Sequence, residues 1–107
     1  MKMEQAIALA TAMRPSELGE EVLTALLLDL EEQLAIEVRG ERLCPRAVTR
    51  TELLVPPPFD RVYWTYLAAM IDLSLGNTES YRQFDALYRE SRDAYARWHQ
   101  RTVGQGN

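Results

Sequence analysis

The residues that most often carry chemistry in proteins are few in this chain of 107 residues, and they lie far apart. Cys44 is the only cysteine and His99 the only histidine, so zinc patterns built from paired cysteines or paired histidines are impossible. Arg42 and Arg46 flank Cys44 and could activate its thiol, but no histidine is close enough in the sequence to form a catalytic pair. We therefore expect Cys44 to be a half-buried loop residue and His99 to lie near the end of a helix.

The carboxylates offer no better catalytic pair. Glu20 and Glu21, and likewise Glu31 and Glu32, are neighbours in the sequence, so their side chains would point about 100° apart on a helix and could not share a site. Asp72 lies within an apolar pattern, and we expect it to pair with an arginine of the last helix rather than to act as an acid or base. No glycine-rich phosphate loop is present in the sequence. The sequence therefore predicts no enzyme, no metal site and no cofactor.

Helices are the elements that would position these residues. Apolar side chains recur at three- and four-residue steps over residues 3–13, from about 20 to 39, from about 58–60 to 75, and from about 78 to 101. Residues 41–57 lack this period, and only 52–55 resemble a short strand. The sequence thus predicts an all-α, four-helix domain over residues 1–107, with a C-terminal αα-hairpin, a long extended loop between helices two and three, and a flexible tail at about 102–107.

Charge is divided unevenly along the chain, whose net charge is −4. Residues 1–40 carry three basic residues against eight acids, whereas residues 77–107 carry five arginines against four acids. We place Asp29, Glu31, Glu32 and Glu37 on the solvated side of the second helix. This balance disfavours blanket phosphate binding, which needs a concentrated basic face. The N-terminal apolar stripe is too short to span a membrane and the lone cysteine suits a reducing compartment, so we expect a cytoplasmic protein with no membrane partner.

Aromatic residues are the clearest feature of the two C-terminal helices. Their helical spacing is most often that of a buried core, but there are more of them than one seam between two helices can hide. Arginines interleave with them on the last helix, and Tyr, Trp and Arg are enriched at protein interfaces. The same combination can stack nucleic-acid bases. A small helical nucleic-acid-binding or regulatory protein, using the Arg/Tyr face of the last helix, is therefore the alternative to a protein–protein contact.

One part of the sequence, residues 51–102, resembles a known family. The segment LLVPPPFD (53–60) is followed by an aromatic helix ending in IDLSLG (71–76), and then by a helix with Tyr81, Phe84, Tyr95, Trp98 and Arg101. This pattern is similar to that of the small head–tail connector (adaptor) proteins of tailed bacteriophages. Two departures stand out: a short basic loop with Arg39, Arg42, Arg46 and Arg50 replaces an acidic one, and SYRQ (80–83) replaces an Asn-rich helix start.

The resemblance implies a structural role in the phage particle. Such a protein forms a ring of about twelve copies below the portal, joins capsid to tail and lines the DNA channel. Its expected partners are other copies of itself, the portal protein, a tail-side neck or stopper protein, and genomic DNA that passes without specific binding. Its expected location is the neck of the virion, at the head–tail interface, and the host cytoplasm during assembly.

The residues most suited to such contacts lie on the proline segment and the aromatic helices. Because prolines restrict the unbound chain, an extended proline arm loses little entropy when it docks. We expect residues 53–57 to run across a neighbouring subunit or along the chain's own helices. The candidate interface residues are Leu53, Leu54, Val55, Pro56, Pro57, Pro58, Phe59, Trp64, Arg82, Arg89 and Trp98.

Overall fold

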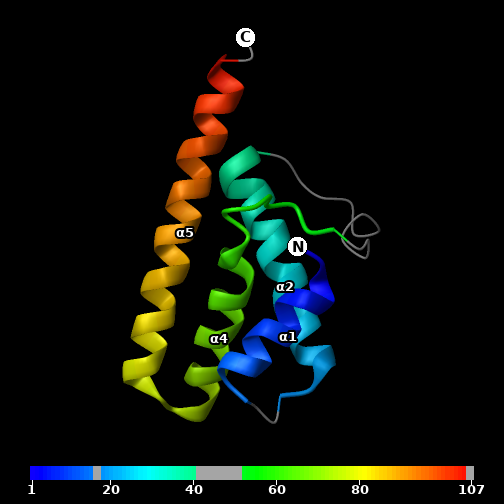
Figure 1. Cartoon of the computed structure of the whole chain (residues 1–107), viewed down its shortest axis with the longest axis vertical. Helices are drawn as coiled ribbons and strands as arrows, with labels where there is room; N and C mark the ends of the chain where they lie inside the picture. The colour runs from blue at the N-terminus through cyan, green and yellow to red at the C-terminus, as the bar shows by residue number, and fades with distance from the viewer. Residues whose placement is uncertain (16–17, 41–51, 106–107) are drawn as a thin grey trace.

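The computed structural model describes residues 1–15, 18–40 and 52–105, with side chains to residue 102 (Figure 1). These residues form α1 (Met3–Met13), α2 (Glu20–Leu34), the π-helical turn η1 (Ala35–Arg39), α4 (Arg61–Leu75) and α5 (Thr78–Gln105). No strand occurs in these ranges, so the all-α prediction is confirmed. The extended loop expected over 41–51, with Cys44 in it, lies outside the described residues.

The N-terminal half consists of α1 and of α2 with its continuation η1. The first helix stops at Met13, two residues before Pro15, because the residue before a proline avoids the α region. The second helix buries a stripe of leucines. It continues directly after Leu34 into one π-helical turn, since Leu34 itself has a helical backbone conformation. Gly40 closes this turn in the left-handed conformation, with φ of 69°.

The C-terminal half consists of α4 and α5, which pack side by side (Figure 1). Gly76 ends α4 with φ of 77°, and the N–H groups of Gly76 and Asn77 donate to the carbonyls of Leu73 and Asp72. Since α5 has 28 residues and α4 has 15, α5 extends well beyond its partner. The expected end of the last helix near residue 102 is corrected, because α5 remains helical through Gln105.

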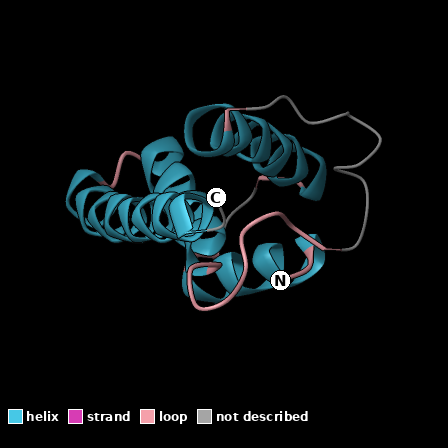
Figure 2. Ribbon diagram, turned by 90° about the horizontal axis from the view of Figure 1, so that it is seen from above, coloured by secondary structure: helices cyan, strands magenta, loops and turns pink. Residues whose placement is uncertain are grey.

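A single apolar cluster joins all the α-helices, and Val38 of η1 packs against it. Viewed from above, the helices surround this centre, and residues just before α4 close it on one side (Figure 2). The buried residues of α1 are Ala6 and Ala10, whose small side chains let this helix pack close to α2 and α4. The larger members of the core are Leu23, Leu27, Leu30, Leu34, Leu53, Val55, Val62, Tyr63, Leu67, Ile71 and Tyr95. Two of these, Leu53 and Val55, belong to no helix.

The turn between α4 and α5 gives a direct test of the backbone geometry. We expect Gly76→Ala to lower the free energy of unfolding by about 1 kcal/mol, because a side chain disfavours the left-handed conformation at φ of 77°. No atom lies within 4 Å of the Cβ position there, so crowding adds nothing. Urea denaturation followed by circular dichroism would measure the loss. Gly76→Asn is the matched control: Asn tolerates this conformation, so its loss should be smaller although its side chain is larger. The reverse order would contradict this explanation.

Candidate functional site

The segment of residues 52–60, here called the arm, is extended at its start, forms a turn over 57–60, and crosses α2 before α4 begins (Figure 1). Its first residue, Glu52, pairs with Lys2 in an isolated antiparallel bridge, and this bridge is all that is found of the expected strand near 52–55. The N–H of Leu53 donates to the carbonyl of Met1 at 2.9 Å. The next two amides, of Leu54 and Val55, donate to side chains of α2 and α4 at 2.8 Å each. Three consecutive amides therefore attach the arm to the N-terminal residue, to α2 and to α4.

The acceptors for these two amides are Glu31 of α2 and Tyr63 of α4. Glu31 Oε2 accepts the N–H of Leu54, and the Tyr63 hydroxyl oxygen accepts the N–H of Val55. The same hydroxyl donates to Glu31 Oε1, so one network joins α2, α4 and the arm. Its centre is dry, since Glu31 is 3% exposed and Tyr63 is fully buried. The prediction that Glu31 lies on the solvated side of its helix is wrong.

Burial dominates the ionisation of both side chains. It raises the pKa of Glu31, although the hydrogen bonds from Tyr63 and Leu54 act in the opposite direction. It also raises the pKa of Tyr63, with a further increase from the adjacent Glu31 carboxylate. The tyrosine therefore stays protonated and able to donate. The sequence contained one signal for this network: Glu31 is four residues after Leu27 and three before Leu34, within the buried stripe.

The far end of the arm is attached to α5. Ser91 Oγ donates to the carbonyl of Phe59 at 3.1 Å, and Ser91 is itself buried. The Phe59 ring lies 5.5 Å from the Trp98 ring and 6.2 Å from the Tyr95 ring, centroid to centroid. Between Val55 and Phe59 the chain consists of Pro56, Pro57 and Pro58, which have no N–H to satisfy. The arm thus contacts the residues before α1 and the helices α2, α4 and α5.

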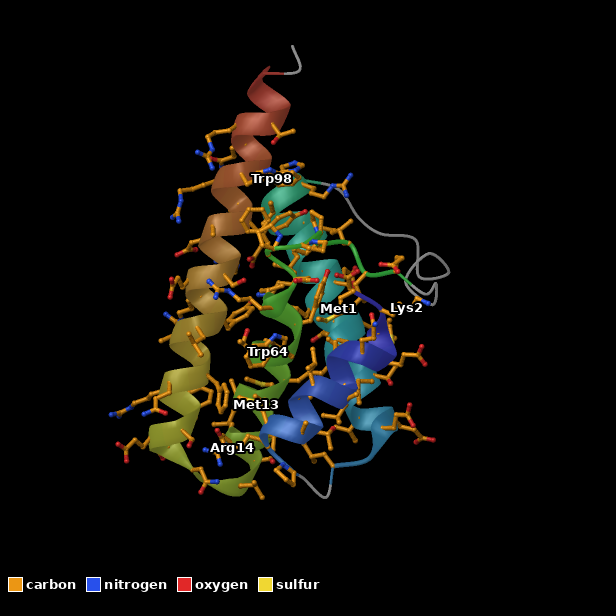
Figure 3. The ribbon with its side chains drawn as sticks, in the orientation of Figure 1. Met1, Lys2, Met13, Arg14, Trp64 and Trp98 are labelled. Atoms are coloured by element: carbon orange, nitrogen blue, oxygen red, sulfur yellow. The ribbon has the colours of Figure 1, made fainter. Side chains whose placement is uncertain are left out.

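A second anchor lies at the opposite end of the α4–α5 pair, at Arg14 (Figure 3). Arg14 Nε lies 3.1 Å from Oδ1 of the buried Asp72, near the end of α4. The same guanidinium donates to Ser80 Oγ and lies over the ring of Phe84, both in α5. Asp72 was expected to pair with an arginine of the last helix; it pairs instead with Arg14, which follows α1. One side chain therefore joins the ends of three helices.

The candidate interface residues are divided between core and surface. Leu53 and Val55 expose 7% and 0% of their areas and pack within the chain's own core. Leu54, Pro56, Phe59, Trp64 and Trp98 are half-buried, and Pro57, Pro58, Arg82 and Arg89 are exposed. The arm brings Phe59 and Trp98 together, whereas Trp64 packs on the core from α4, and Arg82 and Arg89 lie farther along α5. Of the two expected paths, the arm follows the chain's own helices.

A search of the described residues adds no cluster of metal-binding side chains to those considered from the sequence. Within residues 1–15, 18–40 and 52–105, no three His, Cys, Asp or Glu side chains are placed to hold one ion. All buried side-chain nitrogen and oxygen atoms in these ranges have hydrogen-bond partners. His99, expected near the end of a helix, lies within α5, half-buried beside Tyr95. Among the described residues, no helix is both long enough and apolar enough to cross a membrane.

The fold and the site define an all-α protein organised around a docked arm. Comparison with protein-family models, with curated proteins and with solved structures found no match for this chain. The arguments for its function therefore rest on its own residues.

The network around the arm predicts how single substitutions change its stability. We expect Glu31→Ala to speed amide hydrogen exchange at Leu54 by roughly tenfold to a hundredfold, because a buried donor left without its acceptor loses about 1–3 kcal/mol. Tyr63→Phe should have the corresponding effect at Val55, whose N–H donates to the lost hydroxyl. Exchange monitored by NMR resolves the two amides. Glu32→Ala, at the exposed neighbouring position, is the control and should change neither rate. Equal acceleration by Glu32→Ala would rule out a specific role for Glu31.

Two glutamates should respond to pH with opposite signs. Burial raises the pKa of Glu31, so its contribution to folding is greatest below the ordinary carboxyl pKa and falls as pH rises through the folded value. The hydrogen bond from Arg92 lowers the pKa of the more exposed Glu37, so its contribution is present above the ordinary pKa and falls as pH decreases.

Urea denaturation between about pH 4 and pH 8 would separate these effects. The difference in unfolding free energy between wild type and Glu31→Gln should shrink as pH rises, whereas the difference between wild type and Glu37→Gln should grow. Parallel slopes for the two variants would refute the assignment.

Proposed function

We propose that this chain is a structural head–tail connector of a tailed bacteriophage, acting without catalysis. In this role it forms a ring below the portal, joins the capsid to a tail-side neck protein, and surrounds the channel through which DNA passes. Its location is the virion neck, and the host cytoplasm before assembly. The proposal includes the finer architecture: one helical domain in which the αα-hairpin of α4 and α5 follows a long extended loop.

One observation carries this proposal: the residues that produce the resemblance also form the main contacts between the arm and the helices and at the ends of α4. The LLVPPPFD segment is the arm itself, with Leu53 and Val55 in the core. The ID-x-x-x-G element supplies the buried Asp72 that binds Arg14 and the left-handed Gly76. The aromatic pair Tyr95 and Trp98 receives Phe59 at the end of the arm. The residues that produce the resemblance therefore form the contacts at both ends of the α4–α5 pair.

The surface supports an assembly role as well. Several large apolar side chains are exposed by 39–57% of their areas; these are Leu9, Met13, Val22, Ile36, Leu73, Leu75 and Leu87. They are spread over all four α-helices and η1. A subunit that contacts neighbours on several sides would cover such residues, and the extra burial would stabilise a chain whose own core is modest.

The alternative, a nucleic-acid-binding or regulatory protein, is favoured by the exposed arginines of α5. Arg82, Arg97 and Arg101 are exposed and make no ion pair with any described residue. Glu79 and Glu90 are exposed on the same helix, however, and a mixed face attracts phosphate weakly. The connector therefore remains the better-supported function.

Particle assembly tests the proposal. We expect deletion of the gene from its phage genome to leave DNA-filled heads and free tails that do not join, because the bridge between them is missing. Negative-stain electron microscopy of lysates would count joined and unjoined particles. The wild-type gene supplied from a plasmid should restore joining, and the same gene with an early stop codon should not.

Two results would contradict the connector. One is a normal yield of tailed particles after the deletion. The other is retention of generic DNA by the purified protein at about micromolar concentration with strong salt dependence, which would favour the regulatory alternative.

A further inference from the structure

The outward side of α1 is apolar and carries almost no charge. Residues 5–13 (QAIALATAM) contain no Asp, Glu, Lys or Arg. Two of them, Ala6 and Ala10, are buried against the bundle, whereas Leu9 and Met13 expose 43% and 51% of their areas. A surface helix normally presents polar and charged residues to water, as α2 and α5 do with their exposed acids and arginines. The fold therefore explains the inner side of α1 but not the outer side.

Four exposed side chains define this outer surface, here called the α1 face: Ala8, Leu9, Ala12 and Met13. At 100° per residue they fall within an arc of about 140°. Leu9 and Met13 form one row of large side chains along the helix, and Ala8 and Ala12 form a parallel row of small ones. In Figure 1, α1 lies on the outside of the bundle and in front of α2, so a neighbouring molecule can reach it.

The two rows make the α1 face complementary to itself. Consider two α1 helices from different copies, packed antiparallel about a twofold axis that passes between residues 10 and 11. This single register places Leu9 opposite Ala12 of the second copy, and Met13 opposite Ala8 of the second copy. Every large side chain of the face then meets a small one, on both sides of the axis. Alternation of large and small residues across facing positions is what lets two helices interdigitate at close packing.

Charge favours a second copy as the occupant. A partner that placed charged groups over the α1 face would strip them of water without offering them a hydrogen-bond partner, which is costly. The outward sides of α2 and α5 carry such charges, so they fit this face poorly. Two α1 faces meet without removing any charge from water.

The size and surroundings of the face set the strength of this contact. The 11 residues of α1 span about 16 Å, which gives an interface smaller than that of a standard stable complex. The pair is therefore weak and reversible. Each copy also has a net charge of −4, so repulsion opposes the approach of two copies. Salt screens this repulsion and leaves the apolar contact in place.

We propose that the α1 face binds the same face of a second copy of this chain, antiparallel about a twofold axis. Such a contact is isologous: each copy gives and receives the same surface, and the pair closes on itself. The inference goes beyond the proposed connector function and does not rest on it, because neighbours within a ring are joined by two different surfaces.

Exchanging a large and a small residue tests this register. We expect Leu9→Ala alone to weaken self-association by at least about tenfold, because its contact is lost on both sides of the axis. Ala12→Leu alone should also weaken it, because two leucines then collide across the interface. A chain with both substitutions should associate about as well as wild type, since Leu at position 12 again faces Ala at position 9. This double variant has the same composition as wild type, so general apolar adhesion does not explain the recovery. Sedimentation velocity measures all four proteins.

Two lysine variants and the salt dependence serve as controls. Leu9→Lys should abolish association, whereas Leu87→Lys, at an exposed apolar position on α5, should leave it unchanged. Circular dichroism checks that every variant folds. Association of the wild type should strengthen as salt is raised from about 0.05 M to about 0.5 M, because screening reduces the repulsion between acidic copies.

Contrary outcomes are equally specific. A wild type that stays monomeric up to roughly millimolar protein in high salt overturns the inference. So does association that Leu9→Lys leaves intact, that salt weakens, or that the double variant fails to restore above the two single variants. None of these results bears on the connector, which the particle-assembly experiment decides separately.

Discussion

The structure depends on a buried carboxylate that must find hydrogen-bond donors. Glu31 is almost fully removed from water, and its two oxygens accept from the Leu54 amide and the Tyr63 hydroxyl. The arm has the opposite need, because an extended chain without a partner strand leaves its amides unsatisfied. The arm therefore supplies a donor to Glu31, and Glu31 supplies an acceptor to the arm. Removing either partner would leave a buried polar group without its bond, so the path of the arm is tied to one position on α2.

The composition of the arm follows from this attachment. Its donors occur where acceptors are available, at Leu53, Leu54 and Val55, and they stop where the prolines begin. Alternation along the extended chain directs Leu53 and Val55 into the core, while Leu54 between them is half-buried. Phe59 then fills the space beside Tyr95 and Trp98. A segment with no regular secondary structure thus completes the core of a small helical protein.

Sequence reasoning succeeded where local forces decide and failed where distant residues meet. The C-terminal ends of α1, η1 and α4 follow from Pro15, Gly40 and Gly76, whose backbone preferences act without tertiary help. The partner of Asp72 could not be found this way, because Arg14 reaches it across 58 positions through the packing of α1 on α4. The position of Glu31 was predicted wrongly for a related reason. Its charged side chain suggested a solvent-exposed position, whereas its spacing from Leu27 and Leu34 places it among the buried residues of α2.

The two sides of α2 differ in what they contribute to the fold. The inner side carries the leucines and Glu31, and these account for its attachment to α4 and the arm. Nothing in the described fold requires Val22 and Ile36 to be apolar, since both are exposed, or requires so many acids beside them. Exposed apolar side chains lower the solubility of a single chain, and contact with another molecule would cover them. In a chain of this size the core is modest, and the inner side of α2 supplies much of it, whereas Val22 and Ile36 add nothing to it.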